Sequence, residues 1–143
     1  MVHVRDEGSV FDASIEKLWK YIGDDSPGTH VHRAITASKV LEAKGNVVVQ
    51  EMQFLNADGK DTHWETWRLT MNPPRGYTVE AIAGPTKGTR FSQTYTPMGD
   101  KTRVDVEGDW VMPGADDATI KKMTLAFLGE AFNEDNAALK KYK

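Results

Sequence analysis

The chain contains 143 residues, of which 18 are Lys or Arg and 21 are Asp or Glu, and its formal net charge is −3 at pH 7. This length predicts one domain over residues 1–143, with enough chain to bury a core. The lack of cysteine excludes disulfides, thiol nucleophiles and cysteine-ligated metals. Charges of both signs are interspersed, and the longest apolar run has four residues. We therefore expect no nucleic-acid partner, no integral membrane association and a cytoplasmic location.

The N-terminal segment predicts a strand followed by a helix. Residues 2–11 mix valines with charged residues, which is typical of a strand. Asp12 or Ser14 is a suitable N-cap for the helix, and Gly23 is suited to end it. The apolar residues of this helix recur at the spacing of one buried stripe: Ile15, Leu18, Trp19 and Ile22. The segment Asp24–His32, which contains Pro27, predicts a short helix or a loop.

Between Ala34 and Met112, short β-rich runs alternate with turn residues. Six such runs joined by tight turns predict an antiparallel meander. After Pro113, the pattern predicts a long helix over Thr119–Tyr142 with one broad apolar face. Asp116 and Asp117 open this helix, and these acidic residues at its start and the lysines at its end match the helix dipole. Only the predicted sheet offers an apolar surface large enough for this helix to cover.

The turn positions predict which strand residues oppose each other. A two-residue type I′ loop at Asp58-Gly59 places Phe54 opposite His63 and Met52 opposite Glu65. A similar loop at Gly99-Asp100 sets the register of the last two strands. The inner face of the sheet is then apolar but also carries five polar side chains: Lys39, Gln50, His63, Glu65 and Gln93. Because each unpaired buried polar group costs about 1–3 kcal/mol, this set predicts a cavity rather than a solid core.

Several short sequence motifs occur along the chain, and their order is more informative than any one of them. They are Val10–Ser14 leading into Ile15–Ile22, then Pro73-Pro74-Arg75, Gly84-Pro85 followed by Gly88, and Thr96–Val104. In this order they resemble the START and birch-pollen-allergen superfamily, also called SRPBCC, and especially its polyketide cyclase/dehydrase-like branch. The resemblance covers essentially the whole chain. It implies an α+β helix-grip fold, in which a seven-stranded antiparallel sheet curls around a long C-terminal helix and two short helices follow the first strand.

The same resemblance implies several kinds of function. Members hold lipids, sterols, quinones, polyketides or hormones between the sheet and the long helix. Some members are cyclases, aromatases, dehydratases or hydrolases, and others are protein-binding chaperone activators. The superfamily shares no catalytic motif, so it implies no catalytic residue for this chain.

The predicted cavity wall supplies the candidate ligand-binding residues, which come from the inner strand positions and the long helix. They are Met52, Phe54, Glu65, Trp67, Phe91, Tyr95, Trp110, Phe127, Leu128 and Ala131. His63 and Glu65 point the same way because they are two residues apart on one strand. Together with Tyr95, they are the candidate acid/base residues. The alternative interpretation of His63 and Glu65 is a structural pair, completed by Lys39, that closes the cavity rim.

Other polar residues and one glycine are also candidates. Asp135 and Thr124 lie on the apolar face of the long helix, where their side chains would point at a ligand. The alternative for Asp135 is a position in water beyond the edge of the sheet. Gly129 in mid-helix marks a bend or a close approach. His30 and His32 are interpreted as solvated loop residues. Without metal-ligand spacing or a nucleotide-binding string, we expect no metal and no cofactor.

These features predict a protein that binds, transports or sequesters a hydrophobic small molecule such as a lipid, quinone or polyketide. The first alternative is a polyketide cyclase, aromatase or dehydratase that uses His63, Glu65 and Tyr95. The second is a protein-interaction module of the chaperone-activator type, whose partner the sequence does not name. An enclosed volume of roughly several hundred Å³ with convergent polar groups would favour the first two functions over the third.

Overall fold

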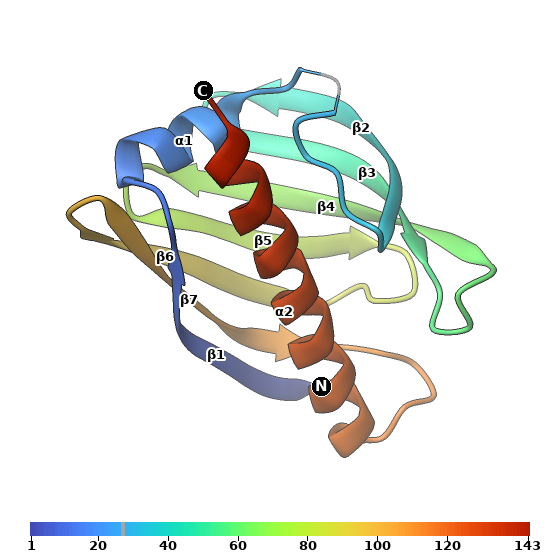
Figure 1. Ribbon diagram of the computed structural model, residues 1–143. Coiled ribbons are helices and arrows are strands. Elements are labelled where there is room, and N and C mark those ends of the chain that lie inside the picture. Colours follow the sequence, from blue (N-terminus) through green and yellow to red (C-terminus); the bar gives the residue numbers. More distant parts are fainter. Residues whose placement is uncertain (27) are drawn as a thin grey trace.

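The computed structural model describes residues 1–26 and 28–143. Its strands form one antiparallel sheet in the order β1-β7-β6-β5-β4-β3-β2. Figure 1 shows the sheet curled around α2, with α1 at one end of the concave face. The predicted α+β helix-grip fold is therefore confirmed. In chain order, the elements are β1 (Val2–Phe11), α1 (Ile15–Gly23), β2 (Ile35–Lys44), β3 (Val47–Leu55), β4 (Thr62–Asn72), β5 (Gly76–Ala83), β6 (Arg90–Met98), β7 (Lys101–Trp110) and α2 (Asp117–Lys141).

Both helices begin at side-chain caps. The hydroxyl of Ser14 accepts the backbone N–H of Lys17 at 3.2 Å, and the carboxylate of Asp116 accepts that of Thr119 at 2.8 Å. These bonds satisfy N–H groups that have no partner inside the helix. Helix α2 also has Asp117 in its first turn and lysines in its last turn, as the helix dipole favours.

Helix α1 is followed by an irregular segment instead of the second short helix that the resemblance implied. Among the described residues 24–26 and 28–34, residues 28–30 and 33–34 form turns or bends, and an isolated bridge joins His32 to Ile35. Pro27 lies outside the described residues. In this segment, backbone N–H groups donate to side chains of the segment itself and of α2 instead of forming helical hydrogen bonds. The Ser26 N–H donates to the Asp24 carboxylate, and the Arg33 N–H donates to Glu134 of α2.

The predicted hairpin registers are confirmed, although one predicted turn is wrong. Phe54 lies opposite His63 in the β3–β4 hairpin, as expected. The loop is longer than two residues, because Asn56 and Asp61 close it with a backbone hydrogen bond of 2.8 Å. A type I′ turn needs positive φ at both central residues, and Asp58 does not have it. A longer loop centred on the same point keeps the register unchanged.

The hydrophobic core lies mainly under one half of the sheet. Its buried residues come from β1, β5, β6, β7 and the two helices. Phe11 of β1 stacks on Phe132 of α2 with ring centroids 4.6 Å apart, and Phe91 stacks on Trp110 at 5.0 Å. By contrast, β2 lies at the edge of the sheet opposite β1 and is exposed along nearly its whole length. Space therefore remains between α2 and the β2–β5 part of the sheet.

Neither helix is long and apolar enough to cross a membrane, among the residues that the structure describes.

Candidate ligand-binding cavity

A cavity of about 840 Å³ lies between the concave face of the sheet and α2. Strand residues at alternate, inward positions form its floor, and one face of α2 forms its roof. Helix α1 and the segment after it close one end. Most of the wall is aliphatic or aromatic, with polar side chains gathered near α1.

Most of the predicted ligand-binding residues line this cavity. They are Met52, Trp67, Phe91, Tyr95, Phe127, Leu128 and Ala131. The structure places Phe54, Glu65 and Trp110 outside the lining. Phe54 is buried, and its ring contacts His63 and Trp67. Trp110 is buried against the ring of Phe91, on the side of the core.

The side chains of His63 and Glu65 are in contact, as their spacing predicts. Glu65 also accepts hydrogen bonds from other side chains of the protein. His63 Nε2 lies 2.5 Å from Glu65 Oε2. The other oxygen of Glu65, Oε1, accepts the indole N–H of Trp67 at 2.9 Å and the hydroxyl of Thr86 at 2.6 Å. Glu65 is only 5% exposed, and both of its oxygens are occupied by donors from the protein.

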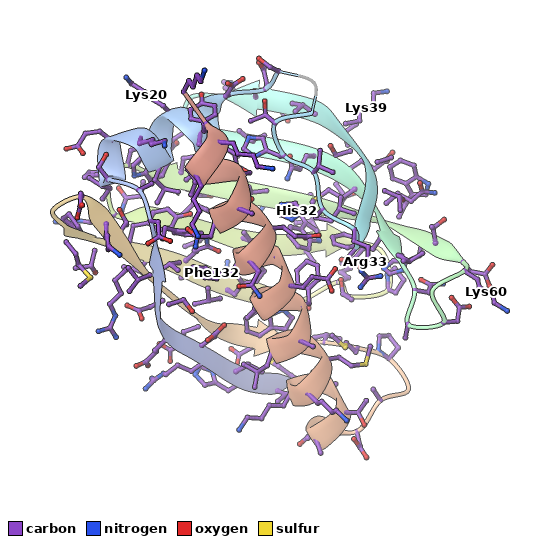
Figure 2. The ribbon with its side chains drawn as sticks, viewed as in Figure 1. Lys20, His32, Arg33, Lys39, Lys60 and Phe132 are labelled. Atoms are coloured by element: carbon purple, nitrogen blue, oxygen red, sulfur yellow. The ribbon has the colours of Figure 1, made fainter. Side chains whose placement is uncertain are left out.

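Lys39 does not join this pair. The sequence places Lys39 on the inner face, whereas in the structure its neighbours Ser38 and Val40 line the cavity. Lys39 points away from α2 in Figure 2. Register shifts on both sides of this part of β2 explain the error, since one extra residue reverses the face of every later side chain.

Two tyrosines, Tyr95, which is buried, and Tyr77, which is partly buried, line the cavity floor. Tyr95 is 5% exposed, and its hydroxyl accepts the amide of Gln93 at 2.8 Å. Burial raises the pKa of Tyr95 well above its ordinary value, and the neighbouring Tyr77 adds to the increase. Burial also raises the pKa of Tyr77, with a smaller contribution from Asp135. Both phenols are therefore neutral near pH 7 and can donate hydrogen bonds into the cavity.

The polar end of the cavity is built from α1, α2 and the segment between α1 and β2. Asp135 Oδ1 accepts the hydroxyl of Tyr21 at 2.8 Å and lies 3.3 Å from His32 Nε2. His32 Nδ1 lies 2.8 Å from a carboxylate oxygen of Glu134. Figure 2 shows His32 and Arg33 beside α2. Arg33 forms two hydrogen bonds with Glu130, so the segment is attached to α2 at two points.

The interpretation of His32 as a solvated loop residue is therefore wrong. Its side chain is 14% exposed and lies between two carboxylates. Asp135 contributes most to raising the pKa of His32, burial opposes this increase, and Glu134 adds to it, giving a value of about 9. His30 lies closer to the surface, where Nε2 contacts the backbone oxygen of Asp24.

Asp135 points into the cavity, which was one of the two positions expected for it. Thr124 is fully buried outside the lining, and its hydroxyl lacks a hydrogen-bond partner among the described residues. The predicted stripe of α1 omitted Tyr21, although Tyr21 is three residues after Leu18 and shares its face. Tyr77 also went unpredicted, although it alternates with Val79 on the inner face of β5. The helical spacing of Tyr21 and the strand alternation of Tyr77 are the sequence signals that could have predicted these two residues.

The raised pKa of His32 predicts that stability falls at alkaline pH. A histidine with a folded-state pKa near 9 and an ordinary value near 6.5 stabilises the fold fully below pH 6.5, and this contribution is lost as the pH rises through 9. The loss is on the order of 2 kcal/mol once solvent screening is allowed for. Urea unfolding at pH 6 and pH 9.5 measures it. The His32→Gln variant should lose this pH dependence, and the control His30→Gln should keep it.

An equal change in His32→Gln and in the unaltered protein would contradict this assignment.

The fold is shared with solved structures, although no family model and no curated protein matches the sequence. The Zhui aromatase/cyclase from Streptomyces sp. R1128 has a TM-score of 0.71 and 16% identity, with 97% of this chain and 92% of that chain covered. The protein TTHA0849 from Thermus thermophilus has a TM-score of 0.77 and 11% identity, with 97% of each chain covered. Ara h 8.0201 has a TM-score of 0.69 and 15% identity, again with 97% of each chain covered.

The resemblance found in the sequence is thus confirmed at the level of the fold. The chain has the helix-grip fold, which it shares with structures that include aromatase/cyclases and Ara h 8.0201.

Proposed function

We propose that this protein binds a largely apolar small molecule, such as a lipid, a quinone or a polyketide, between its sheet and α2. The observation that carries the proposal is the cavity of about 840 Å³, which lies within the range of roughly 300–1,000 Å³ typical of small-molecule sites. Its wall combines a large apolar surface with polar groups gathered at one end. Such a wall gives affinity through burial and orientation through a few hydrogen bonds.

The structure also supports binding over the protein-interaction alternative. Aromatic side chains such as Trp67, Phe91 and Phe127 are directed into the cavity, where a small molecule rather than a protein surface would contact them. The aromatase/cyclase among the structural neighbours is consistent with a ligand that has rings.

The enzymatic alternative places proton transfer at His63, Glu65 and Tyr95. The contacts of Glu65 favour the structural interpretation of this residue, because Trp67, Thr86 and His63 together occupy its two oxygens. A general base must reach the proton that it removes, and Glu65 does not line the cavity. Tyr95 does line it, and its neutral phenol supplies a hydrogen-bond donor for an oxygen of the ligand.

The main test of the proposal is the detection of a small molecule bound to the protein. Native mass spectrometry of protein purified without denaturation should show a co-purifying small molecule, and an apolar fluorescent dye should bind at one equivalent and be displaced by that molecule. A protein that binds no dye and no apolar compound of any tested size would contradict the proposal.

Glu65→Gln separates binding from catalysis. The variant keeps an acceptor for Trp67 and Thr86, and its amide can donate to His63 if the imidazole changes tautomer. We expect dye affinity within about threefold of the unaltered protein and a loss of unfolding free energy of about 1 kcal/mol. His63→Asn is the companion variant and should behave in the same way.

One result of these measurements would support the enzymatic alternative instead of binding alone. If the unaltered protein converts its co-purifying ligand, and both variants bind that ligand normally but convert it roughly 10²–10⁴-fold more slowly, then the enzymatic alternative replaces the proposal.

A further inference from the structure

The charges around the cavity indicate which polar group its ligand carries. We propose that the ligand has a protonated amine, which donates to the carboxylate of Asp135, attached to an apolar and preferably ring-containing body. This inference rests on the proposed binding function and adds the chemical class of the ligand.

The first observation is the charge of the cavity wall. Four aspartates line it, namely Asp6, Asp24, Asp25 and Asp135. Within the part of the chain that the structure describes, the lining includes neither lysine nor arginine. His32 also lines the cavity, but its two ring nitrogens already contact Glu134 and Asp135. A ligand carboxylate or phosphate would therefore lose its hydration without gaining an unpaired cation, which is costly.

The second observation is the geometry of Asp135. Its Oδ1 takes both protein contacts, those with the Tyr21 hydroxyl and His32 Nε2, while Oδ2 has no hydrogen-bond donor among the described residues. The side chain is 27% exposed and belongs to the cavity lining. Oδ2 is consequently a free acceptor at the polar end of the cavity. A carboxylate held in place by a tyrosine and a histidine needs little reorganisation to accept an N–H group.

The imidazolium of His32, which lies beside Asp135, does not reverse the preference of the cavity for an amine. His32 lies between Asp135 and Glu134, so the two carboxylates and one imidazolium leave this group with one negative charge. The raised pKa of His32 keeps the imidazole protonated at neutral pH. Arg33, the nearest arginine in sequence, is paired with Glu130 instead.

The remaining groups around this end suit an organic cation. Tyr77 and Tyr95 line the floor, and Asp135 raises the pKa of Tyr77, which indicates that the field of the carboxylate reaches it. Their rings are neutral and aromatic, and such rings attract ammonium groups through their faces. The walls beyond them are apolar, so the body of the ligand stays out of water.

Three probes with one bicyclic body test the inference: 2-(2-naphthyl)ethylamine, 2-(2-naphthyl)ethanol and 2-naphthylacetic acid. Their affinities are measured at pH 7 by calorimetry. The amine should bind the unaltered protein about tenfold or more tightly than the alcohol, as expected for a charge-assisted hydrogen bond. The acid should bind most weakly.

Asp135→Asn should bring the amine and the alcohol to within about threefold of each other, because the neutral amide lacks the charge that favours the ammonium group. Asp100→Asn, which removes the same charge in the exposed β6–β7 turn, should keep the preference for the amine. The order of the three affinities in the unaltered protein does not depend on either variant folding correctly.

The outcomes separate the two proposals. If the acid binds as tightly as the amine, or if Asp135→Asn keeps the full preference, the inference about the amine is wrong while the binding function stands. If none of the probes and no apolar dye binds, both proposals are wrong.

Discussion

Replacing Ala131 with tryptophan should lower the affinity for an apolar dye by roughly fifty- to a hundredfold. Ala131 lies on the face of α2 that lines the cavity. An indole at this position takes the place of ligand atoms and removes on the order of 100 Å² of apolar contact, or about 2.5 kcal/mol. The same ring fills empty space, so the free energy of unfolding should rise by about 1 kcal/mol.

The matched control is Ala126→Trp. Ala126 is on the same helix but is exposed, so its replacement should change neither the dye affinity nor the stability beyond about 0.5 kcal/mol. Dye titration and urea unfolding of the two variants make the measurement. Normal dye binding by a folded Ala131→Trp variant would mean that the ligand lies elsewhere.

Replacing Gly108 with alanine should cost about 3 kcal/mol of stability and lower Tm by about 10 °C. Gly108 lies on β7 opposite Phe91 of β6. An added Cβ would collide with the backbone oxygen of Arg90 and with Cα and Cβ of Phe91. Because these atoms belong to or adjoin the backbone of a paired strand, the strand itself would have to move. Phe91 also lines the cavity, so dye affinity should fall as well.

Gly129→Ala is the opposite case and serves as the control. An added Cβ on Gly129 meets nothing within 4 Å, so the mid-helix glycine marks no close approach. Alanine is about 1 kcal/mol more favourable than glycine inside a helix, and Tm should therefore rise by about 3 °C. Thermal unfolding of both variants checks the pair. A Gly108→Ala protein as stable as the unaltered one would show that β6 and β7 are less closely paired than the structure has them.

Local sequence patterns predicted the parts of the fold that depend on short-range interactions. The β3–β4 register follows from where the turn residues stand, and it is correct even though the loop is longer than expected. Pairing depends on the centre of the loop, and a loop lengthened equally on both sides has the same centre. In the same way, Ser14 and the spacing of apolar residues located α1, and Asp116 and Asp117 located the start of α2.

The side chains predicted for the cavity wall could be listed from alternation alone, but their separation into lining and buried residues could not. Met52 and Phe54 have the same inward direction on β3, yet only Met52 reaches the cavity. Phe54 is covered by Trp67 and Phe127, which come from another strand and from α2. Exposure to a cavity depends on such neighbours, and strand alternation carries no information about them.

The polar end of the cavity was decided by tertiary structure. Its central contacts join Tyr21 and His32 to Asp135, across more than one hundred positions of sequence. From the sequence alone, His32 is a histidine in a polar segment. The curl of the sheet around α2 brings that segment against the helix and places the imidazole between two carboxylates. The pattern of strands and helices thus followed from local periodicity, whereas the charge that selects a ligand arose from long-range packing.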